Sequence, residues 1–120
     1  MTKRELIDYC LTYPATFEDY PFDETAAVMK HNGNGKMFAL IDFLDGNLFI
    51  NLKCDPVEAD FFRNVYQSVT PAWHMNKTHW NTIYISGDVP EDQLNAMIRH
   101  SFDLTKPKAR KEKGSNKFQE

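Results

Sequence analysis

The dipeptide Asp45-Gly46, set between two strongly apolar segments, constrains the fold of this chain more than any other feature. An Asp-Gly pair between alternating apolar residues is the typical signal of a β-hairpin with a two-residue turn. Such a turn fixes the register in which KMFALIDFL pairs with NLFINLKC. Pairing then starts with Leu44 opposite Asn47 and continues away from the turn.

This register divides the hairpin into two faces, because side chains alternate across a strand. The first face is apolar throughout, and we expect it to be buried beneath helices: Met37, Ala39, Ile41, Phe43, Leu48, Ile50, Leu52 and Cys54. The second face mixes aromatic, amide and charged side chains: Lys36, Phe38, Leu40, Asp42, Phe49, Asn51 and Lys53. A mixed face of this kind is either covered by the TFEDYPF segment or free to bind a ligand.

The remaining elements follow from capping signals and periodicity. Thr2 and Glu5 form a capping box at the start of a first helix. A strand is predicted over residues 26–31, after an irregular aromatic and acidic segment. Asp55 as N-cap and Pro56 at the first helical position predict a second helix that runs to about residue 67.

An alternating strand over residues 80–86 and a helix that begins near Pro90 complete the chain. The order of elements is therefore α-β-β-β-α-β-α. Short hairpin connections indicate an antiparallel sheet, and the apolar hairpin face requires helices on one side. We predict an α+β fold, a two-layer sandwich with the helices packed on one face of the sheet.

Charge separates the chain into a body and a tail. Residues 1–104 carry eight basic and fifteen acidic residues and are predicted to form a single domain. Residues 105–120 carry six basic and two acidic residues, which predicts a disordered basic tail. The chain shows no signal peptide and no membrane-spanning run, and its two cysteines suit reduced thiols, so we expect a cytoplasmic protein with no membrane contact.

The stretch PAWHMNKTHWNTI, residues 71–83, concentrates histidine, lysine, asparagine and tryptophan. It could form a metal site, a catalytic loop, a nucleic-acid contact or a scaffold for its own backbone. His74 and His79 lie five residues apart, whereas a zinc-binding pair on one helix face needs a spacing of four. No neighbouring cysteine or carboxylate supplies a third ligand, so we expect no metal and no cofactor.

A catalytic role also lacks support in the sequence. Ser68 and Ser86 have no nucleophile-elbow motif around them, and Cys54 lies on the apolar hairpin face. We therefore expect that the protein is not an enzyme. Two alternatives remain: lysines and aromatic rings of the loop contact nucleic acid, or the histidine and asparagine side chains hold the loop backbone.

Several segments resemble the MmcQ/YjbR family of small bacterial proteins: YPFDETAAVMK, GKMFALI, LKCDP and above all PAWHMNKTHWNTIYI. The resemblance extends from the first helix to about residue 102. It implies the frataxin-like (CyaY-like) or double-wing α+β fold and a DNA-binding role, but it supplies no catalytic residue. The positions that match the family motif are Pro21, Lys36, Lys53, Pro71, His74, Asn76, Lys77, His79 and Trp80.

We therefore predict weak, sequence-tolerant binding of double-stranded DNA. The predicted contact residues are Lys36, Lys53, Trp73, His74, Asn76, Lys77 and His79. The alternative is a protein-interaction module without nucleic-acid binding, in which the loop is a scaffold and the mixed face contacts another protein.

Overall fold

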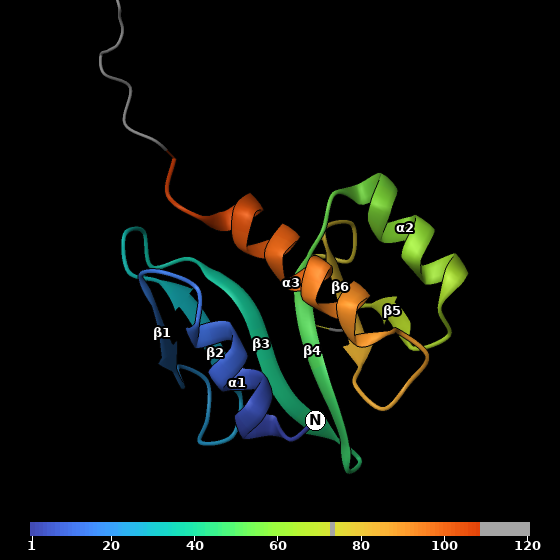
Figure 1. Cartoon of the computed structure of the whole chain (residues 1–120), viewed down its shortest axis with the longest axis horizontal. Helices are drawn as coiled ribbons and strands as arrows, with labels where there is room; N and C mark the ends of the chain where they lie inside the picture. Colours follow the sequence, from blue (N-terminus) through green and yellow to red (C-terminus); the bar gives the residue numbers. More distant parts are fainter. Residues whose placement is uncertain (73, 109–120) are drawn as a thin grey trace, which may run out of the picture.

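The computed structural model describes residues 1–72 and 74–108. In this part of the chain the elements are α1 (Lys3–Leu11), β1 (Thr16–Asp19), β2 (Ala27–His31), β3 (Met37–Leu44), β4 (Asn47–Lys53), α2 (Pro56–Val65), β5 (Val69–Pro71), β6 (Trp80–Tyr84) and α3 (Glu91–Thr105) (Figure 1). The strands form one antiparallel sheet in the order β1-β2-β3-β4-β6-β5. The predicted α+β sandwich is confirmed.

The predicted hairpin register is also confirmed, since Leu44 pairs with Asn47 and Ile41 with Ile50. The capping box of the first helix is present, with the Thr2 hydroxyl accepting from the Glu5 amide. The structure adds two strands that the sequence did not predict, β1 and β5. They have four and three residues and lie at the two edges of the sheet, too short to show a clear alternation.

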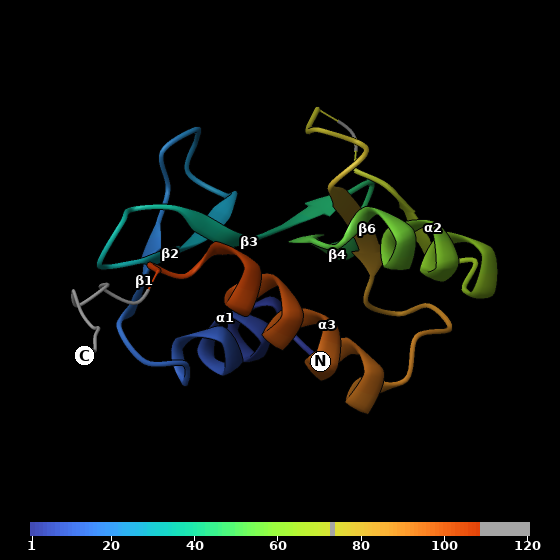
Figure 2. The same cartoon turned by 90° about the horizontal axis from the view of Figure 1, so that it is seen from above.

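The helices cover one face of the sheet, as Figure 2 shows for α1 and α3. α1 contacts β1, β2 and β3, and α3 contacts β3 and β4. α2 lies at the β5 side, where its Phe62 and the Met97 side chain of α3 line one cavity above Ile83. Within residues 1–72 and 74–108, no helix lies on the opposite face of the sheet.

The apolar hairpin face is buried only in part. Ile41, Ile50 and Leu52 are buried as predicted, and they belong to the main core cluster. Phe43 was expected in this core, but its side chain is 50% exposed, so that prediction is wrong. It lies next to the hairpin turn, where the Lys3 ammonium is 5.8 Å from the centroid of its ring.

A β-bulge at Phe38 corrects the predicted composition of the mixed face. Met29 pairs with Ala39 while Lys30 pairs with Met37, so Phe38 is the extra residue in β3. A bulge re-aims a side chain. Phe38 is fully buried, and its ring centroid lies 5.4 Å from that of Phe102 on α3. It therefore belongs to the helix-side core.

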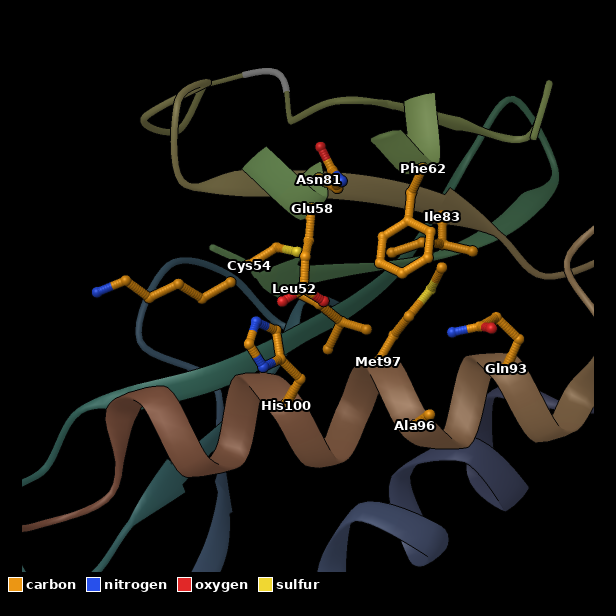
Figure 3. A pocket seen from close by; sticks show the side chains of 11 residues that line it. Leu52, Cys54, Glu58, Phe62, Asn81, Ile83, Gln93, Ala96, Met97 and His100 are labelled. Carbon is orange, nitrogen blue, oxygen red and sulfur yellow. The ribbon is translucent and has the colours of Figure 1, made fainter. Parts of the chain in front are cut away.

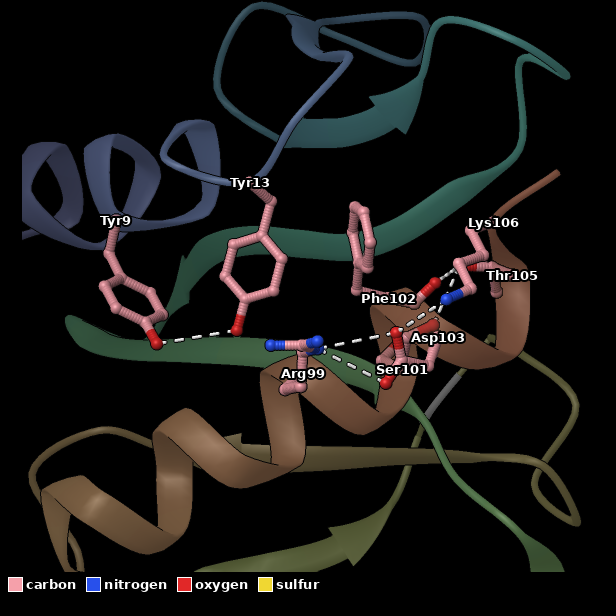
Figure 4. A network of polar contacts seen from close by, with 8 residues as sticks. All are labelled: Tyr9, Tyr13, Arg99, Ser101, Phe102, Asp103, Thr105 and Lys106. Carbon is pink, nitrogen blue, oxygen red and sulfur yellow. Dashed lines mark hydrogen bonds and ion pairs between the residues drawn. The ribbon is translucent and has the colours of Figure 1, made fainter.

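Hydrogen bonds of polar side chains connect the C-terminal part of α3 to the sheet. The Ser101 hydroxyl donates to the Phe38 carbonyl at 2.6 Å and accepts from the Lys53 amide at 2.9 Å. The Thr105 hydroxyl donates to the Ser101 carbonyl at 2.8 Å, which leaves it to accept from His31 Nε2 at 2.8 Å. We call His31, Ser101 and Thr105 with their partners the α3 seam; Figure 4 shows its α3 side chains.

α3 ends at Thr105, the first residue of the predicted tail. Thr105 is buried, so the helix extends one residue beyond the predicted domain. Residues 109–120 lie outside the described part of the chain, and the predicted disorder of the tail stays a prediction.

Candidate nucleic-acid interface

The loop between β5 and β6 is shaped by Asn76. Its side-chain oxygen accepts from the Thr78 amide at 3.0 Å. Its carbonyl accepts from the amides of His79 at 3.1 Å and Trp80 at 2.9 Å. These bonds are those of a turn-forming residue, because asparagine side chains bond the backbone two residues further on. Asn76 therefore acts in the loop backbone, as the scaffold interpretation predicts for this residue.

Arg63 of α2 ties the loop to the helix layer. Its Nε donates to Asn81 Oδ1 at 2.6 Å, and its Nη2 donates to the carbonyls of Lys77 and Trp80. The side-chain nitrogen Nδ2 of Asn81 in turn donates to the Ala59 carbonyl at 3.3 Å. Neither Arg63 nor Asn81 was among the predicted site residues. Their role depends on a contact between α2 and β6 that no local pattern in the sequence reveals.

The predicted loop residues differ in exposure. The His74, Asn76 and Lys77 side chains are exposed, and His79 is half-buried. Trp73 lies outside the described residues. The His79 carbonyl accepts from the Cys54 amide at 2.7 Å, which joins the loop to the end of β4.

The loop also covers part of the mixed face. The buried Asn51 side chain donates to Met75 Sδ at 3.3 Å and accepts from the Thr82 hydroxyl at 2.5 Å. A hollow of about 240 Å³ remains on this face, lined by Asp42, Phe49 and His74 among others. The TFEDYPF segment was one expected cover for this face, but its first four residues form β1 at the sheet edge instead.

Lys36 and Lys53 lie at the same end of the sheet as the loop. Lys53 ends β4 and pairs with Trp80, where the loop enters β6. Lys36 directly precedes β3, which runs antiparallel to β4. Lys36 and Lys77 are 41 positions apart in the sequence, and both lie at this end of the sheet.

The lysines at this end of the sheet differ from the other lysines in their ion pairs. Among the described residues, Lys3, Lys30 and Lys106 lie within 4.0 Å of a carboxylate oxygen. The lysines with no such partner in residues 1–72 and 74–108 are Lys36, Lys53, Lys77 and Lys108. Lys36 and Lys108 line one shallow depression beside the end of α3. We call these four residues the lysine edge.

Both cysteines of the chain are buried. Burial raises the pKa of the Cys10 thiol to about 12 and that of Cys54 to about 11, so neither is a thiolate at neutral pH. Residues 1–72 and 74–108 hold no group of three or more His, Cys, Asp or Glu side chains that could bind a metal ion. The same residues include no helix long and apolar enough to cross a membrane.

Comparison with known proteins gives consistent matches. The YjbR family model matches residues 11–104. The chain is 29% identical over 102 residues to the uncharacterized protein YjbR of Escherichia coli K12, covering 85% of each. It is 31% identical over 118 residues to the uncharacterized protein YyaQ of Bacillus subtilis, covering 88% of this chain and 99% of that protein.

A solved structure supports the same assignment. The Deinococcus radiodurans protein DR2400, with a DUF419 domain, superposes with a TM-score of 0.78 at 33% identity. The match covers 86% of this chain and 77% of the other. Sequence, fold and family model agree over most of the length, and the chain belongs to the YjbR family.

Proposed function

We propose that this protein binds double-stranded DNA weakly and with little sequence preference, through the lysine edge. The observation that carries the proposal is the absence of carboxylate partners at Lys36, Lys53, Lys77 and Lys108 within the described residues. Lysine ammonium groups that contact phosphates release counterions, which supplies sequence-independent affinity. The basic residues that follow Lys108 in the sequence extend the same charge.

The residues in and around the β5–β6 loop have two different roles. Lys77 and His74 face the DNA, while Asn76 and Arg63 hold the loop backbone in position. Trp80 is half-buried at the start of β6 and pairs with Lys53, so it stabilises the strand rather than contacting bases. Phosphate contacts of this kind position a protein without reading sequence, which accounts for the proposed tolerance. No catalytic step is part of the proposal.

The test is a titration of labelled duplex into the full chain at two salt concentrations. Lys77→Ala is expected to weaken binding for all sequences and to flatten the log–log salt dependence by about one unit. The matched control is Lys3→Ala, which removes the same charge from a lysine paired with Asp42 near the hairpin turn. Wild-type protein that shows no binding at low salt would refute the proposal, as would Lys77→Ala with unchanged affinity and slope.

The alternative, a protein-interaction module without nucleic-acid binding, is supported by the outer side of α2. Val57, Phe61 and Val65 follow one another at intervals of four and are 78%, 59% and 51% exposed. Such a stripe on one helix is an exposed apolar patch, which often marks a contact with another protein. If the lysine variants leave duplex binding unchanged, this alternative becomes the better description.

A further inference from the structure

A cavity of about 110 Å³ lies between α2, α3 and the strands β4 and β6 (Figure 3). Figure 3 shows the Phe62 ring of α2 and the Met97 side chain of α3 pointing toward each other, close to Ile83. We call this space the α2–α3 cavity. Its apolar lining consists of Leu52, Cys54, Phe62, Ile83, Ala96 and Met97.

The size and lining of the cavity limit what it can hold. An apolar protein cavity of about 150 Å³ binds benzene. The α2–α3 cavity is smaller, and therefore suits a short branched aliphatic group. Leu52 of β4 and Ile83 of β6 are each 2% exposed, so the sheet closes the cavity on one side. Glu58 of α2 and Ala96 of α3 are exposed, so the cavity opens to solvent between the two helices.

One carboxylate lies at this opening, that of Glu58. In Figure 3 the Glu58 side chain extends from α2 toward α3, on the side of Leu52 and His100. Its charge also acts on the cavity wall. Burial, together with the neighbouring Glu58 and Asp55 carboxylates, raises the pKa of the Cys54 thiol to about 11. The Glu58 carboxylate therefore lies close to the apolar interior.

The Glu58 carboxylate has no cationic partner in the described part of the chain. No lysine, arginine or histidine nitrogen of residues 1–72 and 74–108 lies within 4.0 Å of its oxygens. Two other polar side chains at the cavity are already engaged. Asn81 Oδ1 accepts from Arg63 Nε at 2.6 Å, and His100 Nε2 accepts from the Asp55 amide at 3.1 Å. A ligand therefore has to match an apolar interior with one negative charge at its opening.

We propose that the α2–α3 cavity binds a small primary amine with a short branched alkyl chain. The alkyl chain packs between Phe62, Ile83 and Met97, and the ligand ammonium pairs with the Glu58 carboxylate at the opening. The ammonium adds the attraction of opposite charges to its hydrogen bond. An alcohol of the same shape lacks that charge, and a carboxylate of the same shape is repelled. The site therefore selects both the alkyl chain and the positive charge.

The test uses the full ¹⁵N-labelled chain and three probes with the same carbon skeleton: isoamylamine, isoamyl alcohol and isovalerate. Isoamylamine is expected to give saturable shifts of the Leu52, Ile83 and Met97 amides, with an affinity about fivefold above that of the alcohol, as an exposed ion pair contributes. Isovalerate is expected to bind most weakly. Methylamine carries the charge without the alkyl chain and is expected to leave these amides unshifted.

Glu58→Gln and Glu91→Gln form a matched pair for the charge. Each removes one carboxylate from the first turn of a helix, α2 or α3, but Glu58 lines the cavity and Glu91 does not. Glu58→Gln is expected to remove the advantage of isoamylamine over isoamyl alcohol, and Glu91→Gln is expected to keep it. The affinity for the alcohol changes little in either variant. An advantage of the amine that persists in Glu58→Gln would overturn the proposal.

Ala96→Leu tests the alkyl part of the proposal. Ala96 lines the opening from α3, so a leucine there occupies part of the space and keeps the helix propensity. The folded variant, checked by its ¹⁵N spectrum, is expected to bind the amine and the alcohol more weakly. The proposal fails if isoamylamine gives no saturable shifts at millimolar concentration, if methylamine shifts the same amides equally, or if Ala96→Leu binds isoamylamine like wild type. Duplex binding is measured separately, so failure here leaves the DNA proposal unchanged.

Discussion

The α3 seam and the lysine edge meet at Lys53, and they differ in whether their polar groups have partners. In the seam, the Ser101 and Thr105 hydroxyls and His31 Nε2 all have hydrogen-bond partners. At the lysine edge, four ammonium groups lack a carboxylate partner in the described residues. Lys53 belongs to both, since its amide bonds Ser101 while its ammonium lies at the edge. Separate variants can therefore test the backbone bond of Lys53 to Ser101 and the ammonium group of Lys53.

The largest expected effect concerns Phe38, whose carbonyl accepts from Ser101 in the seam. Phe38→Ala is expected to lower the free energy of unfolding by about 3–5 kcal/mol, because it removes a fully buried ring that packs against His31 and Phe102. Urea denaturation followed by circular dichroism measures this loss. A loss below about 1 kcal/mol would place Phe38 on the open face and contradict the bulge.

Ser101→Ala is expected to have the next largest effect. It leaves the Lys53 amide and the Phe38 carbonyl without their shared partner, and each unsatisfied buried group costs about 1–3 kcal/mol. Denaturation measures the loss, while duplex binding by the folded fraction stays at the wild-type level. Weaker binding by folded Ser101→Ala would show that the seam and the edge are not separable.

The seam also predicts a dependence of stability on pH. Burial lowers the pKa of His31 below the usual histidine value of about 6.5. The unfolded chain therefore binds a proton at a higher pH than the folded chain does. Stability is full above about pH 6.5 and falls as the pH decreases toward the folded pKa. Thermal melts between pH 7.5 and pH 5 measure the slope.

His31→Gln is the control for that slope. The variant is expected to be less stable but to show a shallower fall over the same pH range. An unchanged slope would assign the effect to another group. Asp88 does not interfere, because hydrogen bonds from Ser68 and Gln67 lower the pKa of its carboxyl to about 2, and its effect lies below pH 4.

The smallest expected effects on stability are at the lysines themselves. Lys53→Ala keeps the amide bond to Ser101 and removes only an unpaired ammonium, so the free energy of unfolding is expected to change by less than about 0.5 kcal/mol. Lys3→Ala removes a half-buried ion pair with Asp42 and a hydrogen bond to the Thr25 carbonyl, and is expected to cost about 1 kcal/mol. Denaturation curves of the two variants compare them directly, and the opposite ranking would contradict the difference between paired and unpaired lysines.

The hairpin was predictable because a two-residue turn fixes the register of every pair that follows it. The bulge at Phe38 was not predictable. It turns the Phe38 ring toward Tyr13 and Phe102, which lie far away in the sequence, in a loop and in α3. β1 and β5 were missed for a related reason: edge strands of three or four residues depend on their single neighbour more than on their own pattern.

The candidate site was predicted at the level of residue types rather than roles. The sequence indicated the loop and Lys36, Lys53 and Lys77, and the strand pairing puts these lysines at one end of the sheet. The sequence left open whether Asn76 contacts nucleic acid or holds the loop backbone, and it did not indicate that Arg63 holds the loop from α2. The role of Arg63 depends on a contact between α2 and β6, which no local pattern in the sequence reveals.

The two short edge strands also affect how the protein behaves in a crowded solution. An exposed strand edge is a template on which another chain can add a strand and start an aggregate. β1 offers only four residues for such pairing, and β5 offers three, the last of which is Pro71 with no amide hydrogen. The long and strongly apolar strands β3 and β4 lie inside the sheet, paired on both sides. The strand order therefore protects the most aggregation-prone segments of this sequence for as long as the sheet stays folded.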